Sequence, residues 1–259
     1  MTSGFQHICL HTDGRLAMVQ LHRPAARNAM SVALMRELTA AAHALAERTD
    51  IDAVLLTGDA TCFTAGADLK DTAGWANEAL SLVERREIAG VGWRLCKAWE
   101  ELPQVTIVAI EGYAVGGGLA IAVACDWRVI ASNAFVSLPE IALGIPLTWG
   151  AIPRLTALVG PSRAKRLTIL CARLSAADAL AMGLVDHVTP PGGALAKAAD
   201  LAQQVLAMPA AAVRMSKATV NAVATAGHLA AGHMGLDQLM LAGASDESKA
   251  ARAAALKRR

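Results

Sequence analysis

Residues 112–118 read Gly112-Tyr113-Ala114-Val115-Gly116-Gly117-Gly118, and this stretch decides the interpretation of the whole chain. It follows the apolar, β-branched run 105–110 and precedes the apolar run 119–124. That order predicts a strand, a glycine-rich turn and a buried helix. Successive glycines let backbone N–H groups approach a ligand without a side chain in the way, and the first N–H groups of a helix are unpaired. The turn is therefore suited to holding negative charge on an oxygen atom.

The spacing of these glycines excludes two common nucleotide-binding loops. A dinucleotide-binding turn needs the pattern G-x-G-x-x-G, whereas the pattern here is G-x-x-x-G-G-G. A phosphate-binding loop needs a lysine directly after its last glycine, and none follows this turn. A plain packing role, in which the glycines only let the helix lie close to the sheet, stays open at this point.

Two further segments give the turn a chemical context. The loop 63–70 (FTAGADLK) also follows a predicted buried strand, so both glycine loops can direct a backbone N–H at one point, as in an oxyanion hole. The segment Leu138-Pro139-Glu140-Ile141 places one carboxylate among apolar residues just after another predicted strand. Such surroundings raise the pKa of a carboxyl group and suit a general base. The alternative is an ordinary acid at a helix start.

Composition narrows the class of protein. The chain has 259 residues, of which 54% are apolar and 18% charged, so one large domain or one domain with a small appendage is expected. A net charge of +2 argues against a general nucleic-acid surface. We expect no membrane span and no signal peptide, because the sequence lacks a long uncharged apolar run and a basic, apolar start. The five cysteines are scattered without a C-x-x-C pair, which favours a cytoplasmic location and no metal site.

The expected elements form a mixed α/β core followed by helices. We predict a β-hairpin around Asp13-Gly14, a helix capped by Ser31, strands at 52–57, 105–110, 127–131 and 134–137, and one long helix over 78–101. Beyond Pro139 the pattern is helical, and nothing after Gly193 resembles a strand. The sequence therefore divides into a core over 1–193 and an all-helical region over 194–259.

Taken in order, these motifs resemble the crotonase, or enoyl-CoA hydratase/isomerase, superfamily over nearly the whole chain. The pieces that carry the resemblance are His22-Arg23-Pro24 with Asn28-Ala29, 63–70, 112–118, Asp126, Pro139-Glu140 with Leu143-Gly144, and Gly183-Leu184-Val185. The resemblance implies an α/β fold built as a spiral of β-β-α repeats, with C-terminal helices that form trimers, often paired into hexamers. It also implies a CoA thioester as the substrate, with no separate cofactor.

The resemblance assigns roles by position. It makes Glu140 the catalytic base and the N–H groups of Ala67 and Gly117 the oxyanion donors. It also places the CoA thioester against one loop and one glycine, formed by Ala65, Ala67, Asp68, Leu69, Lys70 and Gly117.

Ala120 departs from the pattern of the hydratases in this superfamily. The resemblance implies that hydratases carry one glutamate two residues after the glycine triplet and a second one directly after the proline. This chain has Ala120 at the first position and Glu140 at the second. Losing one positioned acid–base group typically lowers a rate by about 10² to 10⁴. We therefore expect double-bond isomerisation of an enoyl-CoA with Glu140 as sole base.

Several alternatives remain open beside isomerisation. They are enoyl-CoA hydration in fatty-acid or related acid degradation, decarboxylation, thioester hydrolysis, a non-catalytic acyl-CoA-binding protein and a purely structural oligomer. The resemblance implies that dienoyl isomerases carry a further acid near position 148. This chain has Thr148 there, so dienoyl-CoA isomerisation is disfavoured. Glu111 is interpreted as a surface acid at a strand end, and Trp149 either lines the acyl pocket or packs in the core.

Overall fold

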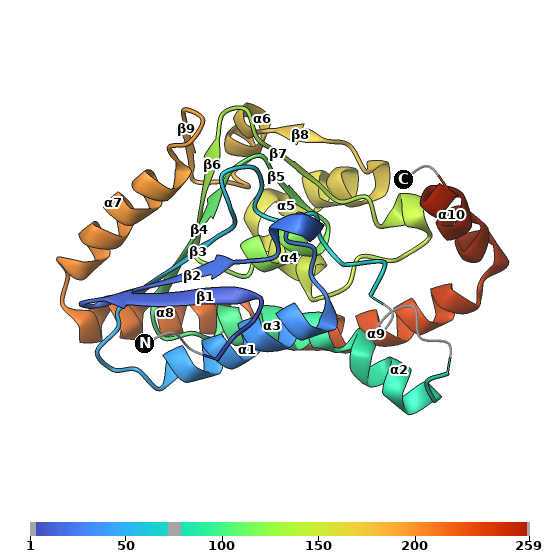
Figure 1. The fold of residues 1–259 in the computed structure, drawn as a ribbon, viewed down its shortest axis with the longest axis horizontal. Helices are drawn as coiled ribbons and strands as arrows, with labels where there is room; N and C mark the ends of the chain where they lie inside the picture. The colour runs from blue at the N-terminus through green and yellow to red at the C-terminus, as the bar shows by residue number, and fades with distance from the viewer. Residues whose placement is uncertain (1–3, 72–78, 258–259) are drawn as a thin grey trace.

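The computed structural model describes residues 4–71 and 79–257. Its main sheet has the strand order β1-β2-β3-β4-β6-β9 (Figure 1). Within this sheet, β1 and β2 pair antiparallel around the turn at Gly14, which confirms the predicted hairpin. The other neighbours in this sheet pair parallel. The strands of this sheet are β1 Ile8–Asp13, β2 Leu16–Leu21, β3 Ala53–Thr57, β4 Val105–Ile110, β6 Trp127–Ala131 and β9 His187–Thr189.

Alternate residues of the central strands face two separate apolar cores. In β3, Val54 and Leu56 belong to the larger core and Ala53 and Leu55 to the smaller one, as the two-residue period of a strand requires. The larger core is covered by α1 Val32–Ala46, α3 Val91–Glu100 and α4 Gly117–Ala122, and the smaller one by α7 Ala194–Leu206. Burial on both faces explains why β3 and β4 are almost continuously apolar.

A second, smaller sheet has the order β5-β7-β8. Its strands are β5 Tyr113–Val115, β7 Phe135–Ser137 and β8 Leu174–Ser175. The glycine stretch therefore holds a short strand, β5, where only a turn was predicted. The expectation of a purely helical chain beyond Pro139 was also wrong, because β8 and β9 lie there. These strands span two or three residues, too few for an alternating pattern to identify them.

The predicted long helix over 78–101 is two helices, with its expected start at Glu78 outside the described residues. They are α2 Leu82–Ala89 and α3, and Gly90 separates them. Ser81 begins α2 with a capping box, in which its hydroxyl accepts from the Glu84 N–H and the Glu84 carboxylate accepts from the Ser81 N–H. The predicted cap at Ser31 is confirmed, since its hydroxyl accepts from the Leu34 N–H.

Helices and two short strands follow along the chain after β7. Short 3₁₀ helices are η1 Pro24–Ala26, which follows β2, and η2 Ile141–Leu143, which follows Glu140. Between η2 and β9 come α5 Ala151–Leu170, which has a non-helical residue at Gly160, and α6 Ala176–Ala181. None of the helices in the described ranges is both long and apolar enough to cross a bilayer.

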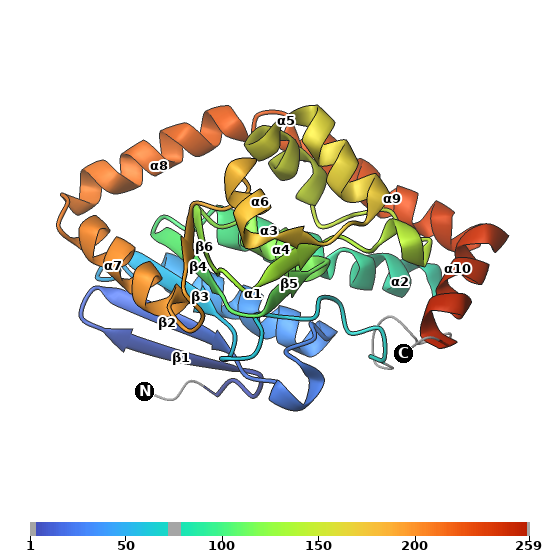
Figure 2. The same ribbon diagram turned by 90° about the horizontal axis from the view of Figure 1, so that it is seen from above.

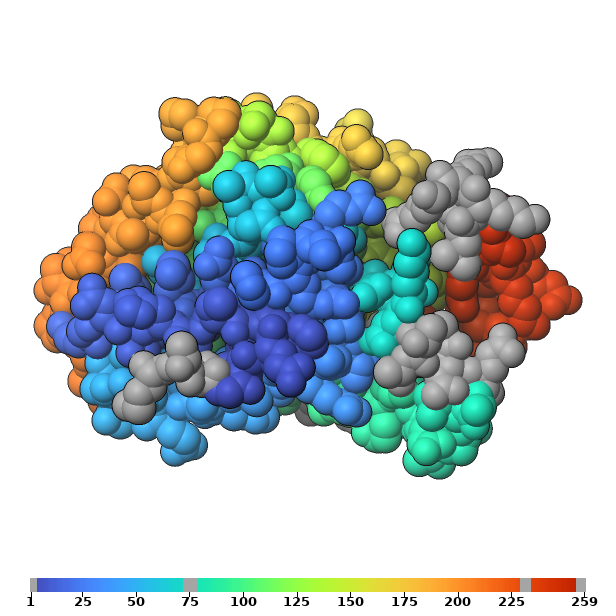
Figure 3. All heavy atoms as spheres, viewed as in Figure 1, coloured from blue at the N-terminus to red at the C-terminus, as the bar shows by residue number. Residues whose placement is uncertain are grey.

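The C-terminal helices run in succession from the end that carries α7 to the opposite end of the molecule (Figure 2). They are α8 Ala210–Ala224, α9 His228–Ala244 and α10 Asp246–Lys257. The red atoms of α9 and α10 form a lobe at that end (Figure 3). α10 packs on η2 so closely that a methyl group on Gly144 would lie 2.6 Å from the Cα atom of Ser248. A trimerising role for residues 194–259 stays a prediction.

Candidate active site

Three extended segments run parallel and end at one place. Thr64 forms a parallel bridge with Ala114 of β5, and Val115 of β5 is in parallel register with Ser137 of β7. The carboxyl ends of parallel strands meet at the same edge, where α/β proteins commonly bind ligands. The loop after Thr64, the glycine triplet after β5 and Glu140 after β7 therefore converge, as the sequence predicted for these three segments.

Two backbone N–H groups have no acceptor among the described residues where the first two segments meet. Met30 donates to the Gly66 carbonyl and accepts from the Asp68 N–H, so the Ala67 N–H points to the other side. Continuing the register of Thr64 with Ala114 sets Ala67 opposite Gly117. A methyl group on Gly66 would lie only 3.5 Å from the Gly117 nitrogen. Neither Ala67 nor Gly117 donates a backbone hydrogen bond to any part of the chain described here.

Each glycine of the triplet is required by a different neighbour. A methyl group on Gly116 would lie 2.5 Å from Oε1 of Glu140, and one on Gly118 would lie 2.4 Å from Cγ2 of Thr64. A methyl group on Gly117 would lie 2.3 Å from Cζ3 of Trp149. Gly116 also has φ +54°, a left-handed conformation that favours glycine. The packing interpretation is therefore true as well, but the groups packed against the glycines are a carboxylate, a hydroxyl-bearing side chain and an indole.

Glu140 presents an unpartnered carboxylate oxygen to this site. The residue is partly buried, and its Oε2 atom is buried without a hydrogen-bond partner in the described structure. Burial raises the pKa of Glu140 to about 7, opposed by a smaller contribution from backbone hydrogen bonding at Glu140 itself. Its carbonyl accepts from the N–H groups of Leu143 and Ile145, both at 2.9 Å, which holds the turn that carries it. A carboxyl group with this pKa can both accept and donate a proton near neutral pH.

Other carboxylates near these segments have structural partners. Both oxygens of Glu111 accept N–H groups at the start of α7, from Gly192 and Ala194 at 3.0 Å, so its role lies at that helix end. The Asp68 carboxylate pairs with Nη1 of Arg23 at 3.1 Å. Ala120, which stands where hydratases of the family carry their first glutamate, is buried, with 1% of its surface exposed.

The predicted CoA-contacting loop is present, with its residues in different situations. The Ala65 N–H already donates to the Arg27 carbonyl, and the Lys70 N–H donates to the Asp68 carboxylate. Leu69 is partly buried and Lys70 is exposed, so the lysine ammonium group is accessible at the loop's end. Within the described residues, the loop therefore offers two N–H groups without an acceptor, at Ala67 and Leu69, and one exposed cation at Lys70.

Sequence reasoning missed Thr64 and left Trp149 undecided. The Thr64 hydroxyl donates to the Asn28 carbonyl at 2.7 Å and accepts from the Gly66 N–H at 3.1 Å, which shapes the loop that presents Ala67. A threonine directly before A-G-A-D is the signal that could have found it. Trp149 is 7% exposed and packs against Gly117, so it is part of the wall around the triplet.

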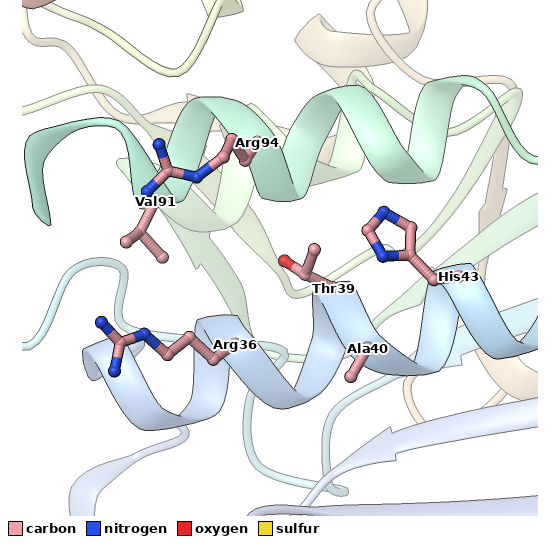
Figure 4. A pocket seen from close by; sticks show the side chains of 6 residues that line it. All are labelled: Arg36, Thr39, Ala40, His43, Val91 and Arg94. Atoms are coloured by element: carbon pink, nitrogen blue, oxygen red, sulfur yellow. The ribbon is translucent and has the colours of Figure 1, made fainter. Parts of the chain in front are cut away.

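A separate pocket of about 280 Å³ lies between α1 and α3. Figure 4 shows the side chains that line it, Arg36, Thr39, Ala40, His43, Val91 and Arg94. Arg94 is already engaged, since it donates to both the carboxylate and the carbonyl of Glu87. None of the predicted site residues lines this pocket, so it is distinct from the convergence of loops described above.

A family model described as "Enoyl-CoA hydratase/isomerase" matches residues 11–257. The chain belongs to this family. Among relatives of this enoyl-CoA hydratase/isomerase family member, a crotonyl-CoA hydratase from Syntrophomonas wolfei is 34% identical over 84% of this chain and 82% of its own. A short-chain-enoyl-CoA hydratase from Clostridium acetobutylicum is 32% identical over 83% of this chain and 81% of its own.

Solved structures agree with this family and its fold. The enoyl-CoA hydratase from Mycobacterium avium subsp. paratuberculosis K-10 superposes with a TM-score of 0.87, at 26% identity, over 98% of this chain and 97% of its own. Pseudomonas aeruginosa DspI superposes with a TM-score of 0.77, at 32% identity, over 85% and 87%. The expected crotonase-like α/β fold with a C-terminal helical region is thus confirmed. The preference for isomerisation gains no support, because these two curated relatives are named hydratases.

Proposed function

We propose that this family member acts on enoyl-CoA thioesters through an enolate. In this proposal the N–H groups of Ala67 and Gly117 bind the thioester oxygen, and Glu140 is the only side chain that transfers protons. The observation that carries the proposal is the pair of unpaired N–H groups beside a buried carboxylate whose Oε2 has no partner in the described residues. The chain's own groups and the substrate suffice for this chemistry, so no separate cofactor enters it.

The two N–H groups would act on the negative charge that develops on the thioester oxygen. An enolate concentrates negative charge on the thioester oxygen, so two N–H donors at fixed positions stabilise the transition state more than the ground state. Each donor of this kind can contribute about 3 kcal/mol. The loop Ala65–Lys70 would bind the CoA portion mainly through its backbone, since the Asp68 carboxylate is engaged by Arg23. The exposed ammonium group of Lys70 is suited to a CoA phosphate.

Hydration of a 2-enoyl-CoA is the reaction that the relatives support. Two of them are named crotonyl-CoA hydratase and short-chain-enoyl-CoA hydratase. With one carboxylate, Glu140 would take a proton from water as the water oxygen bonds to C3. It would then return that proton to C2, which gives a 3-hydroxyacyl-CoA. A pKa of about 7 suits a group that must act first as base and then as acid.

Isomerisation of a 3-enoyl-CoA is the second candidate, and Ala120 favours it. A buried methyl group at this position supplies no second proton-transfer group. Isomerisation needs only one, because Glu140 can take the C2 proton and return it to C4 while the double bond moves from C3–C4 to C2–C3. The same two N–H groups would bind the single enolate between these steps.

The test uses both substrates and one isosteric variant. Purified protein is incubated with 2-enoyl-CoA and with 3-enoyl-CoA, and the products are separated by liquid chromatography, which resolves the two isomers, and identified by mass spectrometry. We expect turnover of at least one substrate, lost in Glu140→Gln and retained in Glu101→Gln, a control glutamate on the exposed surface at the end of α3 that pairs with Lys97. Binding of both thioesters without turnover, unchanged in Glu140→Gln, would instead indicate a non-catalytic acyl-CoA-binding protein.

A trimer, or a dimer of trimers, is part of this proposal. α8 exposes Met215, Val220 and Val223 at 71%, 64% and 77%, a large apolar surface for one helix. Light scattering after size exclusion should give three or six times the mass of the chain, and a monomer would contradict this part of the proposal.

A further inference from the structure

The indole of Trp149 is held between two glycines that belong to two different helices. A methyl group on Gly117 of α4 would lie 2.3 Å from Cζ3 and 2.4 Å from Cη2 of the six-membered ring. A methyl group on Gly92 of α3 would lie 2.0 Å from Cε2 and 2.2 Å from Nε1. The ring therefore fits only because both residues are glycines. A methyl group on either one would displace it.

The backbone of Trp149 shows that this ring position is imposed. Trp149 has φ +59°, a left-handed conformation that a bulky residue rarely adopts, and Gly150 follows with φ +67°. Nη1 of Arg154 donates to the carbonyls of both residues at 3.0 Å. Arg154 is itself buried and bound to the Glu100 carboxylate by two hydrogen bonds of 2.7 Å. Conformations of this kind persist where the surrounding structure determines them, and they cluster at functional sites.

The indole and the Glu140 carboxylate flank the same peptide unit. Methyl positions on the successive residues Gly116 and Gly117 meet Glu140 and Trp149 respectively. The peptide bond between these glycines carries the Gly117 N–H, the donor assigned above. Residues three apart lie on the same side of a helix, so the Ala120 methyl group faces the same side as the Trp149 ring. An acid and an apolar surface thus lie side by side at this peptide unit.

We propose that Trp149 is a positioning and specificity-determining residue for this site. Its ring fixes the orientation of the Gly117 N–H and keeps water from the substrate carbons on that side, so the proton that Glu140 removes is returned to the substrate. This inference rests on the isomerisation branch of the proposed function, and rapid hydration by the wild-type protein would overturn it. It predicts that loosening the ring shifts turnover from double-bond migration towards addition of water.

The test combines direct and indirect changes to the ring. Trp149→Ala removes it, and Trp149→Phe keeps an aromatic ring. Gly92→Ala displaces the indole from the α3 side without altering an atom assigned to the reaction. Gly90→Ala is the matched control, because a methyl group there meets the movable end of the Arg94 side chain at 2.8 Å and the Glu87 carbonyl oxygen at 3.4 Å, and the Gly90 backbone is helical.

The readouts are kcat, KM and the initial ratio of 3-hydroxyacyl-CoA to 2-enoyl-CoA formed from 3-enoyl-CoA. Deuterium incorporation in D₂O is measured on the same products. For Trp149→Ala we expect kcat to fall by up to about 100-fold with little change in KM, because misplacing a donor by about 1 Å has that effect. The product ratio and deuterium content should rise, Gly92→Ala should follow in the same direction, and Trp149→Phe should recover part of the wild-type ratio.

Failure of this inference can be told apart from failure of the proposed function. Wild-type kcat and product ratio in both Trp149→Ala and Gly92→Ala would overturn the role of Trp149 while leaving the function in place. A wild-type protein that turns over neither substrate would overturn the proposed function itself. If Trp149→Ala does not fold, as judged by circular dichroism, the comparison of Gly92→Ala with Gly90→Ala decides the question.

Discussion

The two walls of the proposed site are made in different ways. The wall formed by Ala67 and Gly117 presents backbone N–H groups, and its close neighbours leave no room for a side chain on Gly117. The wall formed by Glu140 and Trp149 presents side chains, one of them a buried acid with a raised pKa. On the first wall the reactive groups belong to the main chain, so a substitution affects them only through the size of the new side chain. On the second wall the proton-transfer group is a side chain, so the isosteric substitution Glu140→Gln is enough to remove it.

The largest expected effect comes from the acid on the side-chain wall. Glu140→Gln keeps the shape of the residue and removes its proton transfer, so kcat should fall by about 10² to 10⁴. Dissociation constants for the CoA thioester, measured by calorimetry, should stay within a few-fold of wild type because the N–H donors remain. A variant with wild-type kcat would show that another group moves the proton.

A size change should break the backbone wall almost as strongly. Gly117→Ala places a methyl group 2.3 Å from the Trp149 ring, so the N–H donor must move. Loss of one oxyanion donor lowers kcat by about 10² to 10³. Gly235→Ala, where nothing lies within 4 Å of the added methyl group, is the control. Equal steady-state rates for the two variants would contradict the assignment of Gly117.

The buried acid should also lower the stability of the folded protein at alkaline pH. Its folded pKa of about 7 lies above the ordinary 4.5, so between these pH values the folded state holds a proton that the unfolded state has released. Stability contributed by this group therefore decreases as pH rises from 4.5 to 7 and stays reduced above 7. Glu140→Gln should be more stable than wild type at pH 8 by up to about 3 kcal/mol.

Urea unfolding at one protein concentration measures this gain. The difference between the two proteins should shrink steadily as the pH is lowered towards 4.5. A difference that is the same at pH 5 and pH 8 would mean that ionisation of Glu140 is not its cause.

The smallest expected effect is on the pH dependence of the rate. If Glu140 reacts as the carboxylate, kcat should reach half its plateau near pH 7 and fall about tenfold per unit below that. Residual activity of Glu140→Gln should lack this limb. Rates measured from pH 5.5 to 9 in buffers of constant ionic strength test it, and a wild-type rate that stays flat down to pH 5.5 would contradict the raised pKa of the group.

The backbone wall could be predicted from the sequence more completely than the side-chain wall. Glycine is informative because few other residues tolerate φ +54° or the close contact of neighbouring atoms seen at Gly116 and Gly117. Both glycine loops could therefore be recognised in the sequence. Glu140 stood out as a lone acid among apolar residues. Trp149 did not, because its left-handed backbone and its place between α3 and α4 depend on Arg154 and on Gly92, which is distant in sequence.

The same distinction applies to the fold. The hairpin and the Ser31 cap are local patterns, and both were predicted correctly. The short strands β5, β8 and β9 exist because neighbouring segments pair with them, and two or three residues carry no period that would show this. Gly90 could have been recognised as a helix boundary, since glycine is a poor helix former, but the flanking apolar positions continue the helical pattern across it.

The contact between Gly144 and Ser248 has a consequence for how the protein is made. The turn that carries Glu140 is covered by α10, whose residues leave the ribosome long after Glu140 itself. A nascent chain that has folded its sheet and both glycine loops therefore still lacks the helix that packs against this turn. Ribosome-bound chains stopped before residue 246 should therefore lack the finished surroundings of Glu140, which are completed only once α10 has left the ribosome.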